Sequence, residues 1–269
     1  MSNLAQRVLT ALVGAPLVFG ALWAGGWTLA GVLVFVALTA QAELYRLFRG
    51  ARPLVAPGLA LGAVAVLRPM LPFADALLAA GALLVLVATL YRASATPLAD
   101  AAATLFGVLY PAALLGAALA LRSAEAPWLF GHEAFWLTLA GLVCVWAADS
   151  FAYFAGRTLG RRALFPRVSP SKTWEGSAGG VVGALALAAT FKLGVLPGVL
   201  SWPDVLALGL ICGGASQFGD LVESHFKRAA GVKDSGRWIP GHGGMLDRVD
   251  ALLFALPLLV LYFEVTRGL

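Results

Sequence analysis

Nine apolar runs, separated by short polar segments, make up most of this 269-residue chain. They cover about residues 8–23, 27–42, 54–66, 73–91, 101–121, 134–148, 179–196, 205–218 and 249–265. About 20 apolar residues cross the hydrocarbon core of a bilayer as a helix, which satisfies every backbone polar group internally. Only 12% of the residues are charged, about half the share in soluble domains, so a water-soluble globule is excluded. The sequence predicts an all-α, polytopic membrane helix bundle with about nine transmembrane helices.

Two of these runs leave room for another interpretation. The first follows Arg7 closely, as in a secretory signal, but it leads at once into a second apolar run, and we interpret it as an uncleaved span. The third is interrupted by Pro57 and Gly58, so a re-entrant segment stays open as an alternative.

The basic residues predict one orientation. With a cytoplasmic N-terminus, the loops on the inner side carry 15 of the 19 lysines and arginines. Only Arg68, Arg122, Lys192 and Arg267 remain outside. By the positive-inside rule, the N-terminus is expected in the cytoplasm and the C-terminus outside. The net charge of +5 is therefore explained by topology, and no nucleic-acid partner is expected.

Charge is concentrated in the second part of the chain. Residues 1–140 hold 12 charged side chains, whereas residues 141–250 hold 19. We therefore expect a scaffold region over residues 1–130, on the lipid or dimer side, and a catalytic region over residues 131–269. Glu43, Asp75 and Asp100, near run ends in the first region, are expected to be pairing or capping groups.

The most informative polar stretch begins at the end of the eighth run. In a continuing helix, Asp220, Ser224 and Lys227 would share one face, and Asp247 and Asp250 would share a face at the start of the last run. Carboxylates at a membrane boundary are costly unless they are paired or bind a cation. Helix capping with salt bridges is one explanation. The other is a magnesium ion held by few carboxylates, with phosphate oxygens and water completing its shell.

A second polar cluster lies between the sixth and seventh runs. Asp149 ends an apolar run, and its alternatives are a pairing with Arg157 or a part in the same cation or nucleotide site. Ser169–Gly176 is expected to be a loop, with Lys172 as a phosphate-binding residue. The glycines of residues 240–244 precede a helix, so their amides could approach an anion, although a simple turn explains them almost as well. His242, between glycines, is expected to contact phosphate or substrate.

The polar residues of this region resemble the signature of the phosphatidate cytidylyltransferases, also called CDP-diacylglycerol synthases. Every position of that signature is matched by Ser224, Lys227, Arg228, Lys233, Asp234, Gly236, Pro240, His242, Gly243, Gly244, Asp247, Arg248 and Asp250. The segments at Asp149 and at Lys172 are also similar to the family. One departure is Ser171, where the family often has a second lysine.

The resemblance implies a multi-pass enzyme of the inner, cytoplasmic membrane that converts CTP and phosphatidic acid into CDP-diacylglycerol and pyrophosphate, with magnesium and as a homodimer. It implies Asp220 and Asp247 as metal ligands. From the residues themselves, one or two cations are expected, with Asp250 and Asp149 as supporting candidates. Together with Lys172, Asp220 and Asp247 form the expected catalytic set. The expected substrate-binding residues are Asp149, Ser171, Ser224, Lys227, Arg228, Lys233, Arg237, His242, Gly243, Gly244 and Arg248.

The residue types suit this chemistry, because the lipid phosphate can itself attack the α-phosphorus of CTP and no nucleophilic side chain is needed. Both polar clusters are expected to face the cytoplasm, where CTP is found. Two other functions are the alternatives. A CDP-alcohol phosphotransferase would need an Asp-Gly-x-x-Ala-Arg opening, which the chain lacks. A cation-coupled transporter would use the carboxylates near the bilayer midplane, whereas here they lie at run ends.

Overall fold

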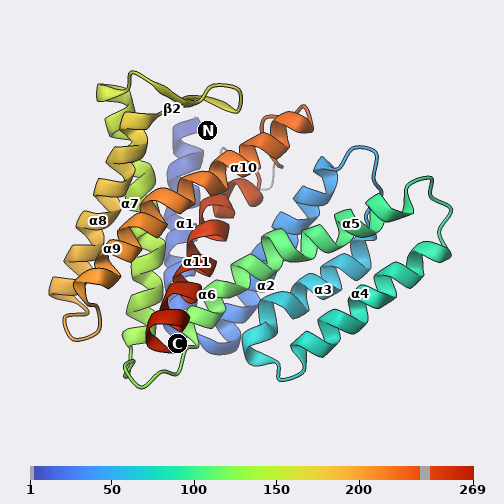
Figure 1. Cartoon of the computed structure of the whole chain (residues 1–269), viewed down its shortest axis with the longest axis horizontal. Coiled ribbons are helices and arrows are strands. Elements are labelled where there is room, and N and C mark those ends of the chain that lie inside the picture. The colour runs from blue at the N-terminus through green and yellow to red at the C-terminus, as the bar shows by residue number, and fades with distance from the viewer. Residues whose placement is uncertain (1–2, 237–242) are drawn as a thin grey trace. The chain divides into compact units, whose positions relative to one another are not determined.

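The structure is a computed structural model that describes residues 3–236 and 243–269 (Figure 1). This part of the chain forms eleven α-helices: α1 (Asn3–Ala24), α2 (Gly26–Leu47), α3 (Val55–Leu67), α4 (Ala74–Leu90), α5 (Pro97–Gly107), α6 (Leu114–Arg122), α7 (Glu133–Leu159), α8 (Trp174–Gly194), α9 (Trp202–Leu210), α10 (Ser216–Ala229) and α11 (Leu246–Arg267). A 3-10 turn, η1 (Arg68–Met70), follows α3. The π-helical turns η2 (Val108–Ala113) and η3 (Ile211–Ala215) join α5 to α6 and α9 to α10. Each joined pair forms one continuous helical segment.

The apolar helices correspond one to one to the predicted runs. Six are long and apolar enough to cross a bilayer: Gly26–Leu47, Pro97–Arg122, Glu133–Leu159, Trp174–Gly194, Trp202–Ala229 and Leu246–Arg267. Three shorter ones cover Leu12–Ala24, Val55–Met70 and Ala74–Leu90. The predicted fold class, an all-α polytopic membrane helix bundle, is thus confirmed for the described residues. The third run is a continuous helix over Val55–Leu67, because Pro57 lies in its first turn, where no intrahelical amide bond is lost.

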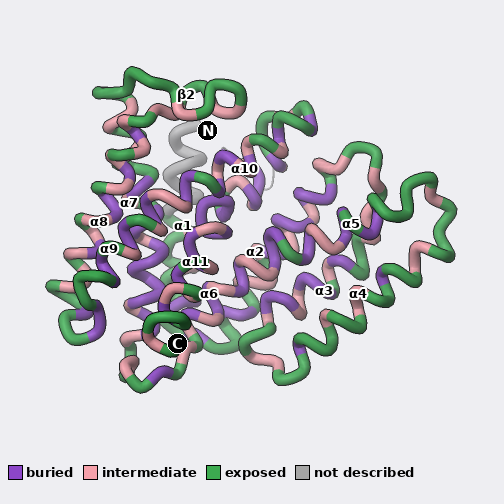
Figure 2. Tube along the Cα trace, viewed as in Figure 1, coloured by how far each residue is buried: buried purple, intermediate pink, exposed green. Residues whose placement is uncertain are grey.

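Helix α4 shows how the bundle presents apolar surface outward. Only Ala74 and Val85 of this helix are buried, and Figure 2 shows exposed positions along most of its length. Leu84 and Leu90 are 67% and 80% exposed. A surface of this kind is expected where side chains contact lipid tails, which are as apolar as leucine.

Two local structures differ from the sequence-based expectation. Helix α7 continues to Leu159, well past the predicted end at Ala148. Ser169–Thr173, expected within a loop, is the strand β2, which pairs antiparallel with β1 (Ala163–Phe165). Helix α8 then starts directly after β2, because the Thr173 hydroxyl accepts a hydrogen bond from the Gly176 amide at 3.1 Å and caps the helix.

The chain divides into two compact units. The first comprises Met1–Leu119 and Ala229–Val249, and the second comprises Ala120–Arg228 and Asp250–Leu269. Residues of each unit mainly contact other residues of the same unit. The functional boundary expected near residue 130 stays a prediction.

In the first unit, α2 is tied to its neighbours by a buried polar network. The Tyr45 hydroxyl donates to the Thr104 carbonyl at 2.7 Å, and the Gln41 amide donates to the Gly58 carbonyl at 2.7 Å. A β-carbon at Gly58 would collide with the Tyr45 ring, so glycine is required for this close approach. Because buried polar groups are costly without partners, these bonds fix α2 against α3 and α5.

In the second unit, α7 and α8 lie against each other through small residues. A β-carbon at Gly176 would stand 2.9 Å from the Ala152 carbonyl oxygen, closer than packing allows. The far end of α11 is held by Arg267, which donates to the Asp204 carboxylate at 3.0 Å and stacks over the Trp128 ring at 4.1 Å. Because α8 begins directly after β2, its packing against α7 sets the position of the strand end that carries Lys172.

Candidate functional site

The predicted carboxylates fall into two polar clusters, one in each unit. Helix α11 contributes to both, because Asp247 lies in its first turn, which belongs to the first unit, and Asp250 begins the part that belongs to the second. Asp220 lies in α10, in the second unit.

In the first unit, the Asp247 side chain is held by the described residues that come before it in the chain, 235–236 and 243–246, which together are called the Asp247 segment. Its Oδ2 atom accepts hydrogen bonds from the Gly244 amide at 2.7 Å, the Ser235 amide at 3.0 Å and the Ser235 hydroxyl at 2.9 Å. Gly243 has φ = 78°, a left-handed conformation that glycine adopts without strain. The glycines thus allow a turn that wraps backbone amides around a carboxylate of the chain itself.

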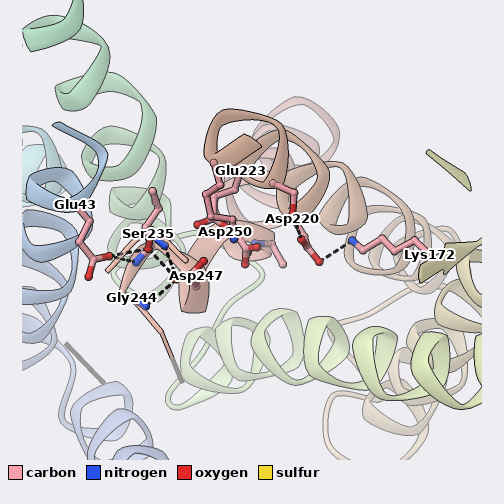
Figure 3. A network of polar contacts seen from close by, with 12 residues as sticks. Glu43, Lys172, Asp220, Glu223, Ser235, Gly244, Asp247 and Asp250 are labelled. Carbon is pink, nitrogen blue, oxygen red and sulfur yellow. Dashed lines mark hydrogen bonds and ion pairs between the residues drawn. The ribbon is translucent and has the colours of Figure 1, made fainter. Parts of the chain in front are cut away.

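The same segment also contacts α2 (Figure 3). Glu43 is fully buried, and its Oε2 atom accepts from the Ser235 hydroxyl at 3.0 Å and from the Leu246 amide at 2.9 Å. The expectation that Glu43 is a pairing or capping group is therefore confirmed, since it caps α11 through Leu246. It is likewise confirmed for Asp75, paired with Arg68 at 2.7 Å, and for Asp100, which accepts from the Arg52 amide at 2.6 Å.

In the second unit, Lys172 meets Asp220. The Lys172 ammonium on β2 lies 2.6 Å from the Asp220 carboxylate on α10, and the Ser224 hydroxyl donates to the other Asp220 oxygen at 3.1 Å (Figure 3). The Lys172 and Asp220 side chains remain 25% and 40% exposed, so the pair is accessible. The structure thus joins residues from both sequence motifs, and the predicted helical face of Asp220 and Ser224 is present.

A more deeply buried group of charges lies one turn along α10. The Lys227 ammonium forms an ion pair with Glu223 at 2.8 Å, with side chains 10% and 0% exposed. Asp250 is buried as well, accepts from the Ala251 amide at 2.8 Å, and lies close enough to Asp220 and Lys227 for their charges to act on it. Lys227 is therefore engaged with a carboxylate of its own helix, and its predicted contact with substrate stays a prediction.

The other predicted substrate-binding residues are more exposed to solvent or lie outside the described part of the chain. Asp149, Ser171, Arg228, Lys233 and Arg248 are exposed. Arg237 and His242 lie outside the described residues. Sequence reasoning missed Glu223 and Ser235, and it missed that Glu43 caps the helix that carries Asp247. The only available signal for Glu43 was a carboxylate near the end of an otherwise apolar run.

The candidate metal-binding groups in these clusters are carboxylate oxygens, which are the donors that magnesium prefers. Among the side chains of residues 12–236 and 243–269, no three or more histidine, cysteine, aspartate or glutamate residues are grouped so that they could hold a metal. Magnesium, however, usually takes only one or two carboxylates and completes its shell with water and phosphate oxygens. Asp247 in the first unit, and Asp220 and Asp250 in the second, each offer hard oxygen donors of the kind that magnesium takes.

Comparison with known proteins points to one enzyme family. A family model described as the cytidylyltransferase family matches residues 5–266. The phosphatidate cytidylyltransferase of Haemophilus influenzae is 47% identical over 129 residues, 47% of this chain and 45% of that protein. The enzyme of the same name from Bacillus subtilis is 51% identical over 118 residues, 44% of this chain and 43% of that protein. That of Thermotoga maritima is 42% identical over 131 residues, 47% of this chain and 48% of that protein. The matched segment spans less than half of each of these relatives.

Proposed function

Because the chain belongs to the cytidylyltransferase family, we propose that it transfers the cytidylyl group of CTP to phosphatidic acid, giving CDP-diacylglycerol and pyrophosphate. The observation that carries the proposal is the accessible Lys172–Asp220 pair with Ser224, which joins both sequence motifs at one place. The names of the relatives support the substrates. The cation-coupled transporter has no support from the family model.

In this reaction a phosphate oxygen of phosphatidic acid attacks the α-phosphorus of CTP. The new P–O bond forms as the bond between the α-phosphorus and the bridging oxygen to the β-phosphate breaks, and pyrophosphate leaves with the electron pair. Charge neutralisation and positioning account for most catalysis of this kind. The Lys172 ammonium can exchange its contact with Asp220 for a phosphate oxygen, because the pair is partly exposed. Arg228, Lys233 and Arg248, which are exposed, can add further positive charge.

We propose magnesium as the cofactor, held by Asp220 and Asp247 with Asp250 in support, as one ion or two. When bound, magnesium would neutralise the triphosphate and the charge that develops on pyrophosphate. The carboxylate of Asp247 is oriented for this role by the Gly244 and Ser235 donors, so little reorganisation is needed when a ligand arrives.

The location of the site and the oligomeric state are also proposals. We propose that the chemistry takes place on the cytoplasmic side of the inner membrane, supported by the charge bias of the loops and by the cytoplasmic supply of CTP. We further propose a homodimer. The location is tested by labelling, in intact cells, single cysteines introduced into the hairpin of residues 163–173. The homodimer is tested by measuring the mass of the detergent-solubilised protein.

The test of the activity is conversion of labelled CTP into a chloroform-soluble lipid by the purified protein with phosphatidic acid. Product is expected with magnesium and not with chelator. Formation of labelled lipid should equal release of pyrophosphate in moles. Folded protein that forms no lipid product with magnesium would overturn the proposal.

A further inference from the structure

Glu43 occupies an unusual position for a carboxylate. It lies in α2, a helix apolar enough to cross a bilayer, and its relative exposure is 0%. Burial of a carboxylate is costly unless hydrogen bonds compensate it. Its Oε2 atom has two donors, whereas Oε1 has no hydrogen-bond partner among the described residues. The hydrogen bonds therefore compensate the cost of burying Glu43 only in part. A role in positioning its two donors would explain why a carboxylate is present here.

Both donors to Glu43 belong to the segment that organises Asp247 (Figure 3). The Leu246 amide is the first of α11, directly before Asp247. The Ser235 hydroxyl lies 3.0 Å from Glu43 Oε2 and 2.9 Å from Asp247 Oδ2. The Ser235 hydroxyl therefore lies within hydrogen-bond distance of both carboxylates. Because it has a single hydrogen, it donates to one of them at a time, and its position depends on both.

The segment is also shaped to fit against Glu43. A β-carbon at Gly236 would collide with Oε1, and one at Gly244 would collide with Oε2 and with the Ser235 hydroxyl. Two glycines of the family signature are therefore required here for contact with a side chain from a distant part of the sequence. An alanine at Gly244 would also stand 2.7 Å from the Gly236 backbone nitrogen, so the backbone would have to move, whereas an alanine at Gly236 would displace the Glu43 side chain.

We infer that Glu43 is a positioning residue, which fixes the start of α11 through Leu246 and the Asp247 carboxylate through Ser235. The expected effect of Glu43 substitutions on CTP turnover rests on the proposed function. Their expected effect on amide protection near Asp247 does not. Residues that orient a functional carboxylate in this way typically cost roughly 10–100-fold in activity when they are removed.

The first test is amide hydrogen exchange of the purified full-length protein. In Glu43→Ala the Leu246 amide loses its acceptor, so exchange at Gly244 and Leu246 is expected to be at least about tenfold faster than in the wild type. Glu43→Gln keeps an acceptor oxygen of the same shape and should retain protection within about threefold. The matched control is Asp100→Ala, which removes another buried carboxylate of the same unit, bonded to the Arg52 amide. It should leave exchange at these two positions unchanged.

The second test is a double-mutant cycle in the labelled-CTP assay. Glu43→Ala and Ser235→Ala should each lower kcat roughly 10–100-fold with less than about threefold change in the KM for CTP. Their combination should be little worse than either alone, because both remove the same bridge. Additive losses in kcat would overturn the inference. So would unchanged amide exchange in a folded Glu43→Ala variant. A Glu43→Gln variant that exchanges as fast as Glu43→Ala would overturn it as well.

The two tests separate this inference from the proposed function. If the wild type makes no lipid product, the proposed function fails, and the exchange data still decide whether Glu43 orders the segment. If the wild type is active and exchange is unchanged in Glu43→Ala, only the inference fails. Should Glu43→Ala not fold, Ser235→Ala, which removes the same bridge, takes its place, and Glu43→Gln stays the conservative comparison.

Discussion

The Lys172 ammonium and the Asp220 carboxylate lie 2.6 Å apart, and they join a hairpin strand to a membrane helix in the second unit. Neither side chain is fully buried, so the attraction between them is screened by solvent. A pair of this kind contributes only about 0–1 kcal/mol to stability. The contact is therefore better suited to exchange with a ligand than to holding the fold together.

The first prediction concerns Lys172. Lys172→Ala is expected to lower kcat/KM for CTP by about 100-fold or more, because an ammonium that neutralises phosphate is lost, while the midpoint of thermal unfolding changes little. The matched control is Lys192→Ala, which removes a lysine bonded to the Leu200 carbonyl at 2.6 Å. A control variant as inactive as Lys172→Ala would assign the loss to folding instead of substrate contact.

The second prediction concerns Asp247. Asp247→Asn should abolish turnover and leave membrane insertion intact, because the amide keeps the size of the side chain but loses the charge that a cation requires. Insertion is measured by membrane fractionation and turnover by labelled lipid formation. Asp75→Asn, which breaks an exposed pair with Arg68, serves as the control and should keep full activity. Near-normal turnover in Asp247→Asn would remove Asp247 from the metal set.

Local patterns predicted those features that depend on neighbouring residues. The apolar runs gave the helices because hydropathy is set by consecutive side chains, and the four-residue spacing placed Asp220 and Ser224 on one face. The β1–β2 hairpin was missed because its five-residue strand, Ser169–Thr173, lacks alternating apolar residues. Its order comes from pairing and from the Thr173 cap.

Contacts between distant segments could not be predicted from one sequence. Glu43 and Ser235 are 192 positions apart, and no local pattern connects them. Similarly, the sequence placed Lys227 on the face of Asp220, but it gave no reason to expect that Glu223 would pair with Lys227 in a buried setting. The candidate site was thus predicted as a set of residues, while the partners that orient them became visible only in three dimensions.

The third prediction concerns Gly176, where α8 begins. In Gly176→Ala the new methyl group would stand 2.9 Å from the Ala152 carbonyl oxygen and 3.1 Å from the Gly156 backbone, so α8 must move away from α7. Overpacking of this kind costs about 1–3 kcal/mol, and movement of the adjacent strand should also displace Lys172. Thermal unfolding and CTP turnover should both decline. Gly194→Ala on the same helix meets nothing within 4 Å and should change neither.

The final prediction concerns the buried pair of Glu223 and Lys227. In Lys227→Gln the buried Glu223 charge loses its partner, so a loss of about 3–5 kcal/mol is expected. Glu223→Gln should cost less, because the Asp250 charge still acts on Lys227. The double variant restores a neutral hydrogen-bonding pair and should be more stable than the sum of the two losses predicts, by at least about 1 kcal/mol. Denaturant unfolding of the purified protein measures this coupling. Purely additive losses would mean that the two side chains do not stabilise the protein through their mutual contact.

Turnover of the double variant tests the predicted substrate contact of Lys227. If the variant is stable but turns over CTP far more slowly, Lys227 also contacts substrate. If it is stable and active, the predicted substrate contact of Lys227 is wrong and its role is confined to the buried pair.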